Sequence, residues 1–487
     1  MSASIDATVG FEMVIGLEIH CQLRTNSKLF SAASANFGDA PNANTDVVCL
    51  GLPGALPVCN RRAIELATRA SLGLGCTVHP VSVFARKHYF YPDLPKGYQI
   101  SQFDRPLATA GRVVIGVEPD GSPRAIRITR VHVEEDAGKS VHDRFPGFTA
   151  IDLNRAGTPL IEIVSEPDIR SSADAGAYVR AVKQILEYTD VSDANMEEGS
   201  LRVDVNISIR PRGATSLGTR TEIKNLNTIS GVERSIEVEF ARQCAVVASG
   251  GAVEQRTMLW DAARNEVRPA REKEGSHDYR YFPEPDLPPL VLDPSWIDAH
   301  RDALPELPEA KRARFAQAYG LSAAEIEALT ATVALADRFE AIAAAGGDPK
   351  RAANWLLGTV LASINASGLS LDTHPVSVAR LGALIRLEAE GAVSNTAAKQ
   401  IFARLEAADD EPRAIAEREG LLQVSDDGAL VRWIDEVFAE MPAETARFLG
   451  GEKKLQGVLV GAVMRKSGGS ADPRKVNQLL GARTAAP

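Results

Sequence analysis

Apolar and polar side chains alternate strictly along residues 201–210, and every odd position from Leu201 to Ile209 is apolar. This period of two predicts a β-strand with one buried face and one polar face. The polar face combines cations, a carboxylate and small hydrogen-bonding groups, which favours binding of an anion through the arginines or through a metal ion. The polar positions are Arg202, Asp204, Asn206, Ser208 and Arg210.

The same alternation runs along residues 13–23, near the start of the chain. Its odd positions are apolar, and Gly16, Glu18, His20 and Gln22 share the opposite face. The pattern predicts a second strand with one buried and one polar face.

A third alternating segment changes phase in its middle. Ile126 and Ile128 are apolar at even positions, whereas Val131 and Val133 are apolar at odd positions. A shift of one residue predicts a β-bulge around Thr129-Arg130, a feature that is common beside active sites.

If these three segments share one sheet, their polar faces converge. The converging groups would then be Glu18, His20, Asp204 and one of the consecutive residues Glu134 and Glu135. Hard carboxylate oxygens favour Mg²⁺ or Mn²⁺, and a single imidazole is more acceptable to Mn²⁺. The alternative is that Glu18 and His20 form an ordinary surface pair on an edge strand.

The patterns also divide the chain into regions. Two helical patterns, at about 172–189 and 230–248, interrupt a strand-rich first part. The segment 278–289 contains four prolines, and it is expected to be an extended segment that closes the first domain, because proline has no N–H to donate.

After about residue 294 the chain becomes rich in Ala, Leu, Glu and Arg at helical spacing, with repeated Gly and Pro breaks. This pattern predicts a series of short helices. The expected fold class is α+β: a mainly antiparallel sheet domain at 1–295, an all-α helical domain at 296–408 and a small helical tail domain at 409–487.

Composition narrows the class of protein. The chain has 487 residues, 45% of them hydrophobic, and no apolar run long enough for a transmembrane helix. Met1–Gly10 lacks the pattern of a signal peptide. The five cysteines contain no Cys-x-x-Cys pair and are expected to be free thiols. We therefore expect a cytoplasmic protein without a membrane partner.

The formal net charge of −10 argues against nucleic acid as a partner. The last 37 residues nevertheless form a local basic region, which is typical of a surface that binds a phosphate backbone. The alternative is a solvated helical surface. The basic residues are Lys453, Lys454, Arg465, Lys466, Arg474, Lys475 and Arg483.

Glu162 stands inside an apolar run and is expected to be buried, so it needs a partner or a raised pKa. In a structural role Glu162 would form an ion pair with Arg155 or Arg170. In a functional role it would act as a base or position ammonia. Gly138-Lys139-Ser140 resembles the end of a P-loop, but Val133 stands where the first glycine belongs. Lys139 is therefore expected in a turn that is able to contact phosphate.

Cations surround the expected acidic cluster in sequence. Residues 86–98 interleave Arg, Lys and aromatic residues, including Lys87, which suits contacts with phosphate and stacking on a base, or else a packed aromatic loop. Arg220 and Lys224 follow the strand of Asp204. An acidic metal cluster ringed by Arg and Lys fits phosphoryl transfer.

Six motifs strongly resemble one family, the B subunit of the aspartyl/glutamyl-tRNA(Asn/Gln) amidotransferase. The resemblance spans nearly the whole chain, including the helical C-terminal part. The motifs are Val14–His20, Tyr89–Gln99, Glu134–Ser140, Asp152–Leu160, Met196–Arg202 and Asp278–Asp286.

The resemblance implies a ligase with a cradle domain related in fold to glutamine synthetase. It implies ATP-dependent activation of a misacylated Glu-tRNA(Gln) or Asp-tRNA(Asn) to an acyl phosphate, which ammonia converts to the amide. The expected partners are an amidase-type glutaminase, which supplies the ammonia, and a small third subunit, which together complete a heterotrimer. The tail domain is expected to contact the tRNA.

The resemblance also implies site residues. The Mg²⁺ ligands, with Mn²⁺ as a possible substitute, would be Glu18, His20, Glu135 and Asp204. Zinc, which some members bind through paired cysteines, is not expected, because Ser31 and Ala33 leave only Cys49 in that region. The catalytic set adds Glu162, and the residues expected to bind the cofactor are Arg202, Lys139, Arg220, Lys224 and Lys87.

Two other functions compete with this one. A non-catalytic tRNA-binding scaffold is the first, but a scaffold has no use for a convergent acidic face that repels RNA. A stand-alone ATP-dependent ligase or kinase for a small acid is the second, but a small substrate does not require a basic helical tail.

Overall fold

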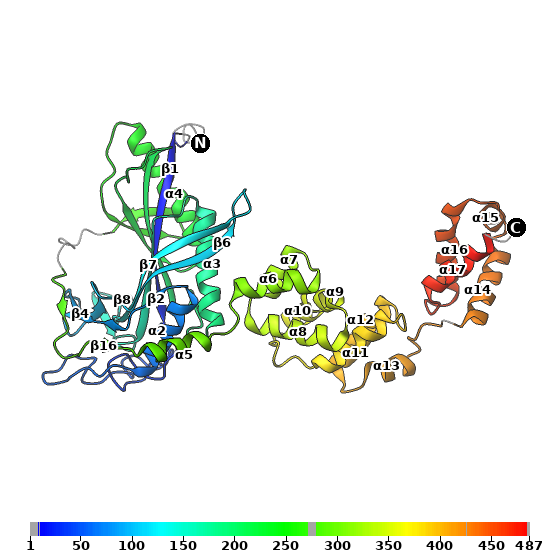
Figure 1. The fold of residues 1–487 in the computed structure, drawn as a ribbon, viewed down its shortest axis with the longest axis horizontal. Helices are drawn as coiled ribbons and strands as arrows, with labels where there is room; N and C mark the ends of the chain where they lie inside the picture. The colour runs from blue at the N-terminus through cyan, green and yellow to red at the C-terminus, as the bar shows by residue number, and fades with distance from the viewer. Residues whose placement is uncertain (1–7, 9, 271–278, 425, 485–487) are drawn as a thin grey trace. The chain divides into compact units, whose positions relative to one another are not determined.

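The computed structural model describes residues 8, 10–270, 279–424 and 426–484, and the chain divides into two compact units at Lys311/Arg312 (Figure 1). The division comes later than the boundary expected at residue 295, because helix α5 (Pro294–Asp302) buries Ile297 in the core of the first unit. Predictions for the sheet domain, the proline-rich segment and the tail domain include residues 1–7, 9, 271–278, 425 and 485–487, which lie outside the described residues.

A nine-stranded sheet organises the first unit. All its ladders are antiparallel except the one between β12 and β13, in agreement with the expected mainly antiparallel domain. In spatial order the strands are β14 (Glu266–Pro269), β13 (Thr257–Asp261), β12 (Thr221–Leu226), β11 (Leu201–Pro211), β1 (Phe11–Gln22), β10 (Pro159–Ser165), β7 (Pro123–Glu135), β6 (Ala108–Val117) and β2 (Thr77–Val78).

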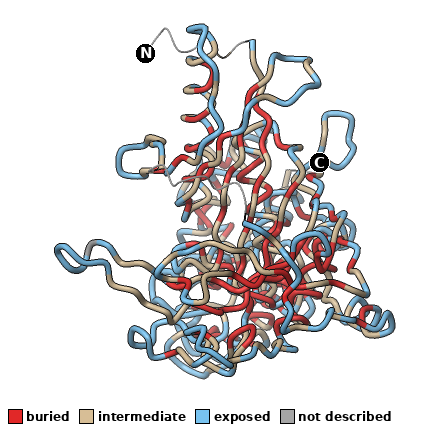
Figure 2. Tube along the Cα trace, turned by 90° about the vertical axis from the view of Figure 1, so that its left-hand side faces the viewer, coloured by how far each residue is buried: buried red, intermediate tan, exposed pale blue. Residues whose placement is uncertain are grey.

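One face of this sheet carries the core. The odd residues of β1 and β11, such as Leu17 and Val205, are buried among residues of the helices α2 (Arg61–Gly73), α3 (Ser172–Tyr188) and α4 (Ile229–Ala248). Figure 2 shows buried residues concentrated in the interior of the trace and exposed residues mainly in the peripheral loops. Because side chains alternate across a strand, the even residues of β1 and β11 lie on the opposite, polar face.

The long helices begin where the sequence supplies a capping side chain. Ser171 accepts a hydrogen bond from the backbone of Asp174 at the start of α3, and Thr228 caps α4 in the same way. Such caps satisfy N–H groups that have no partner inside the helix. Both helices match the expected positions within one residue.

A bulge re-aims the end of β7, as expected. Val164 of β10 pairs with Arg130, and Ser165 pairs with Ile128, so Thr129 is the extra residue. After the bulge Val131 and Val133 face the core, and His132 and Glu134 join the polar face.

Three small sheets complete the first unit. The first orders β15 (Phe282–Pro283), β4 (Phe84–His88) and β5 (Tyr98–Gln102); the others pair β16 (Leu290–Val291) with β3 (Val81–Ser82) and β8 (Lys139–Phe145) with β9 (Phe148–Asp152). The described part of the proline-rich segment, 279–289, contains no helix; it is extended except for a turn at 285–287.

The second unit is helical. Its elements are α6 (Pro308–Tyr319, which starts before the division), α7 (Ala323–Leu329), α8 (Val333–Gly346), α9 (Pro349–Asn354), the π-helix η1 (Trp355–Val360), α10 (Leu361–Ser367), α11 (Val378–Ala389), α12 (Asn395–Ala407), α13 (Pro412–Arg418), α14 (Asp427–Glu440), α15 (Pro442–Leu449), η2 (Lys453–Leu455), α16 (Gln456–Lys466) and α17 (Pro473–Thr484).

Two hydrophobic clusters stabilise these helices. Helix α13 gives Ile415 and Ala416 to the first cluster, which also contains residues of α8 and α11. The second cluster is built from α14–α17 and begins at Leu430. The tail core therefore starts after the boundary expected at residue 409, because the apolar face of α13 packs with the preceding helices. Among the described residues, no helix is long and apolar enough to cross a membrane.

Candidate metal and phosphate site

Adjacent strands bring the polar residues together row by row. Glu18 of β1 lies opposite Asp204 of β11. His20 lies opposite Glu162 of β10, and Glu162 lies opposite His132 of β7. Directly opposite residues of antiparallel strands point to the same face, so residues far apart in sequence form one continuous polar surface.

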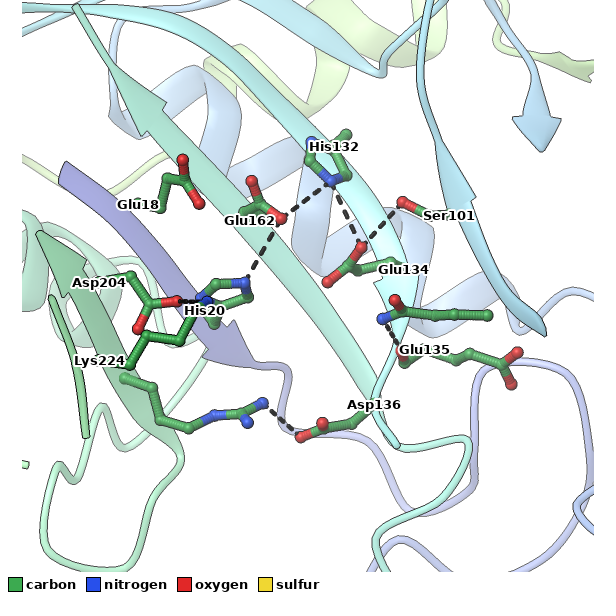
Figure 3. Close-up of polar contacts among 12 residues, drawn as sticks. Glu18, His20, Ser101, His132, Glu134, Glu135, Asp136, Glu162, Asp204 and Lys224 are labelled. Atoms are coloured by element: carbon green, nitrogen blue, oxygen red, sulfur yellow. Dashed lines mark hydrogen bonds and ion pairs between the residues drawn. The ribbon is translucent and has the colours of Figure 1, made fainter. Parts of the chain in front are cut away.

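The first group on this surface, the inner cluster, consists of His20, His132, Glu134 and Glu162 (Figure 3). A single oxygen of Glu162 lies 3.4 Å from Nε2 of His20 and 3.4 Å from Nε2 of His132. His132 Nε2 is also 3.5 Å from Glu134, which accepts a 2.8 Å hydrogen bond from Ser101 of β5. Ligand atoms of His20, Glu134 and Glu162 all lie within 4.8 Å of one another.

The second group, the outer cluster, consists of Glu18, Asp204 and Glu222, whose carboxylates also lie within 4.8 Å of one another. Lys224 Nζ is 2.7 Å from Asp204 and 3.0 Å from Glu222. Asn206 donates a 3.0 Å hydrogen bond to Glu18. The cluster therefore combines three carboxylates with one lysine cation.

Asp136 anchors a third part of the surface, at the end of β7. Its carboxylate accepts hydrogen bonds from Arg202 at 2.6 Å and from Gln22 at 3.0 Å, and Arg155 lies 3.7 Å away. The two guanidinium groups lower the pKa of Asp136, although its burial acts in the opposite direction. Arg202 is thus held at the edge of the polar face by a buried carboxylate.

In the inner cluster, the protonation of the histidines and that of the carboxylates depend on each other. Burial disfavours the imidazolium form of His132, but Glu162 and Glu134 outweigh burial and raise the pKa of His132 to about 9. Burial would also raise the pKa of Glu162, but the contacts with His132 and His20 hold it well below its usual range. The two histidines therefore favour the charged form of Glu162.

Glu18 behaves differently. Burial, and then the Glu162 and Glu222 carboxylates, raise the pKa of Glu18 above its ordinary value. Negative charge has accumulated here without a matching number of cations, and a divalent cation would relieve it. The donor set of carboxylate oxygens with imidazole nitrogen suits Mg²⁺ or Mn²⁺.

The structure does not bring Glu135 into either cluster. Its side chain points away from them (Figure 3), pairs with Lys96 and accepts a 3.0 Å hydrogen bond from the backbone of Ile100. The reason is strand parity, since consecutive residues point to opposite faces. Of the two glutamates that the strand pattern left open, Glu134 is the one that joins Glu162 and His20.

The other predicted catalytic residues lie on the polar face. Glu18, His20, Asp204 and Glu162 are all part of the two clusters. The partners of Glu162 are the two histidines, not Arg155 or Arg170, which contact backbone carbonyls.

The predicted cofactor-binding cations are divided. Lys224 lies in the outer cluster, and Arg202 lies beside that cluster. Lys87 lies near the inner cluster, because Glu134 and Glu162 raise the pKa of Lys87 against the effect of burial. In the part of the chain that the structure describes, Lys139 and Arg220 are exposed and contact neither cluster.

The turn before Lys139 has a structural explanation. A Cβ added to Gly138 would lie 2.9 Å from the backbone oxygens of Asp93 and Asp152. Glycine therefore allows the β8 strand to pass close to the 89–97 loop, where Ser140 donates a 2.9 Å hydrogen bond to Asp93.

Sequence reasoning missed His132, Glu222 and Ser101. His132 had a signal, because it alternates with Val131 and Val133 and so had to share the polar face with Glu134. Glu222 alternates with Lys224 in the same way. Ser101 carried no signal, because its contact with Glu134 depends on a separate small sheet.

The basic region of the tail is partly neutralised. Lys466 pairs with Glu436 and Glu440 of α14, and Arg483 pairs with Asp435 of the same helix. Lys475 lies 3.3 Å from Asp427. The other four cations of the region are exposed and have no acidic partner among the described residues: Lys453, Lys454, Arg465 and Arg474.

The sequence is similar to those of known proteins over most of its length. Residues 13–298 match the model of the GatB/GatE catalytic domain, and residues 337–483 match the model of the GatB domain.

Three relatives illustrate the similarity, and each is described as the B subunit of an aspartyl/glutamyl-tRNA(Asn/Gln) amidotransferase. The relative from Alkalilimnicola ehrlichii is 50% identical over 471 residues, which cover 96% of this chain and 98% of the relative. The relative from Geobacter sulfurreducens is 49% identical and covers 97% and 99%. The relative from Thermosynechococcus vestitus is 49% identical and covers 97% and 96%.

Proposed function

Since the chain belongs to the GatB family of tRNA-dependent amidotransferase subunits, we propose that it carries the transamidation site of such an enzyme. The reaction converts Glu-tRNA(Gln), Asp-tRNA(Asn) or both to the corresponding amide, with glutamine as the amide donor. The observation that carries the proposal is the joint presence of the inner and outer clusters on one face of the sheet.

The proposed chemistry explains why such a face is useful. A carboxylate is a poor acceptor for ammonia, so it must first be activated, and ATP would supply the phosphoryl group that converts it to an acyl phosphate. Both steps concentrate negative charge, which cations must neutralise. The cations of this chain that are best placed for phosphate oxygens are Arg202, Lys87 and Lys224.

The residues that would hold Mg²⁺ are those of the two clusters. Glu134 replaces Glu135 in the set, and Glu18, His20, Asp204 and Glu162 remain from the sequence prediction. When bound, the metal would polarise phosphoryl oxygens and offset their charge. His132 contributes by holding Glu162 and Glu134 at 3.4 and 3.5 Å from its own Nε2.

We also propose two partner proteins: an amidase-type glutaminase that supplies ammonia and a small third subunit, which with this chain form a heterotrimer. An exposed apolar segment supports an interface on the first unit. Phe37, Val47, Leu56 and Val58 are 76%, 53%, 61% and 74% exposed within one loop region. Several exposed apolar side chains that are close in sequence favour an interface with another protein.

The tail is proposed to contact the tRNA. The exposed cations Lys453, Lys454, Arg465 and Arg474 offer the phosphate contacts that such binding requires. A glutamine synthetase-like cradle and a cytoplasmic location are parts of the same proposal, and the free cysteines support the location.

The scaffold alternative is not favoured. A face on which Glu18, Asp204 and Glu222 lie within 4.8 Å of one another repels RNA phosphates unless a cation is present. Such a face is useful to an enzyme and costly to a scaffold.

Reconstitution of the complex tests the proposal. The assembled proteins should convert misacylated Glu-tRNA(Gln) or Asp-tRNA(Asn) to the amide, with ATP consumed in step with product. Free ammonium should replace glutamine. Amide formation without ATP consumption, or none with either tRNA, would reject the proposed function.

A further inference from the structure

An aromatic wall stands beside the inner cluster, and the transamidation chemistry described above does not use it. Rings from three separate segments form the wall. Its members are Tyr89, Tyr279, Tyr281 and Phe103, with ring centroids 6.2 Å apart for Tyr89–Tyr279 and 6.1 Å apart for Tyr279–Tyr281.

Phe103 and Tyr281 form the most ordered part of the wall. Their rings are parallel within 8°, with centroids 4.1 Å apart. Phe103 is nevertheless 53% exposed. Because Tyr281 stacks on one face of the Phe103 ring, we infer that the exposed surface of Phe103 includes its other face.

Residues next to the wall connect it to the inner cluster. Ser101, two residues before Phe103, donates a 2.8 Å hydrogen bond to Glu134. Lys87 lies across β4 and β5 from Gln99, and its Nζ is 5.1 Å from the ring of Tyr279. The wall, a cation and the carboxylates therefore occupy one neighbourhood.

This combination has a specific use. A planar base stacks on an aromatic ring, while the phosphate or ester attached to the base needs cations. Lys87 supplies such a cation, and the carboxylates themselves do not attract an anion without one. The core of a protein–protein interface is usually apolar and poor in charged residues. The charges beside the wall therefore favour a nucleotide over a protein as its ligand.

We propose that the exposed face of Phe103 binds an adenine ring, which continues the stack begun by Tyr281 and Phe103. The proposal rests on the proposed function, which brings two adenines to this site. One belongs to ATP and the other to the 3′-terminal adenosine of the aminoacyl-tRNA. Phe103 then acts as a positioning residue, because it holds a base and touches no reacting atom.

The test uses the reconstituted complex with ammonium chloride as the nitrogen source. KM for ATP is measured at saturating Glu-tRNA(Gln), and KM for Glu-tRNA(Gln) is measured at saturating ATP. Phe103→Ala and Phe103→Leu should raise one of the two KM values about tenfold, with little change in kcat. Phe103→Trp should keep this KM near the wild-type value, because the tryptophan ring stacks on a base and the leucine side chain does not.

The KM that rises identifies the adenine: ATP in the first assay, the tRNA end in the second. Phe148→Ala is the matched control, since Phe148 is 77% exposed but lies in the β8–β9 hairpin outside the wall. Thermal unfolding of each variant separates loss of binding from loss of folding.

Three results would overturn the proposal. The first is that both KM values stay within twofold of the wild-type values. The second is that leucine substitutes as well as tryptophan, which means that only apolar bulk matters. The third is that Phe103→Ala impairs formation of the complex in gel filtration, which means that a protein covers the ring.

Failure of the proposed function gives a different result. If the wild-type complex forms no amide, equilibrium binding of a non-hydrolysable ATP analogue and of Glu-tRNA(Gln) still reports on Phe103. Unchanged affinity of Phe103→Ala for both ligands would then reject the adenine site as well.

Discussion

Glu134 and Glu135 are consecutive in the chain, yet their carboxylates lie on opposite faces of β7. Glu134 is 3.5 Å from His132 and shares its neighbourhood with Glu162 and His20. Glu135 pairs with Lys96 on the other face.

This relationship predicts a difference in cation binding between two isosteric variants. Glu134→Gln should weaken Mn²⁺ binding at least about tenfold, because it removes a charged oxygen from the inner cluster. Glu135→Gln should bind Mn²⁺ like the wild type. Electron paramagnetic resonance of free Mn²⁺ measures both affinities, and the reverse order of effects would show that the face assignment does not decide metal binding.

The outer cluster predicts that substitution of its carboxylates abolishes transamidation but leaves tRNA binding intact. Asp204→Asn or Glu18→Gln should reduce transamidation with free ammonium by at least about a hundredfold, because each change removes charge that a cation requires. Filter binding of the tRNA should remain within twofold.

Glu12→Gln is the control for this pair, because Glu12 lies on the same strand but pairs with Arg210 at 2.6 Å, outside the clusters. Full activity of the Asp204 or Glu18 variant would remove that residue from the ligand set.

The tail predicts a graded effect on tRNA affinity. Alanine at Lys453, Lys454, Arg465 and Arg474 should weaken tRNA binding. The slope of the logarithm of the tRNA binding constant against the logarithm of the salt concentration should become less steep by about one unit for each phosphate contact that is lost. ATP hydrolysis should change little.

Lys466→Ala is the control variant, because Lys466 already forms ion pairs with Glu436 and Glu440. Its effect should be smaller than that of any of the four exposed cations. Unchanged affinity in the fourfold variant would identify the region as a solvated helical surface.

Helix α7 predicts a pH-dependent contribution to stability. Hydrogen bonds from Lys350 and Ser322 lower the pKa of Glu325 from 4.5 to about 2. A carboxyl group with a lowered pKa in the folded state stabilises the fold above its unfolded pKa, and the contribution disappears as the pH falls from about 4.5 to about 2.

Glu325→Gln should therefore lower the stability of the chain at pH 7 by about 0.5–1 kcal/mol, as expected for a helix cap with a surface ion pair. The difference should shrink below pH 4.5, the ordinary pKa of the group. Urea unfolding at several pH values measures it, with Glu327→Gln on the same helix as the control. A difference that is independent of pH would exclude the charge as its cause.

Much of the site could be predicted from local patterns. Alternation assigned Glu18, His20 and Asp204 to polar faces, and the phase shift in β7 predicted the bulge at Thr129. Local rules succeed here because the side-chain period of a strand is fixed by its backbone.

The same alternation, continued past the bulge, selects Glu134 and not Glu135. The family resemblance implies Glu135. In the structure Val131 and Val133 face the core, so Glu135 follows them to that side of the strand and Glu134 lies beside Glu162 and His20. A motif identifies a segment but does not orient its side chains.

Other parts of the site could not be predicted from the sequence. The contact of Ser101 with Glu134 depends on how a small sheet meets the large one, and the stack of Phe103 on Tyr281 joins residues 178 positions apart. The neutralisation of Lys466 by α14 also depends on helix packing, because charges pair by proximity in space.

The sequence by itself determined the helices α3 and α4, the polarity of the strand faces and the family of the chain, since these depend on period, capping residues and motif order. It did not predict helix α2 (Arg61–Gly73). Only the tertiary structure decided which groups meet. The order β11-β1-β10-β7 brings Asp204, Glu18, Glu162 and His132 into neighbouring rows. That order arises from hydrogen-bonded register between distant strands, which no local pattern encodes.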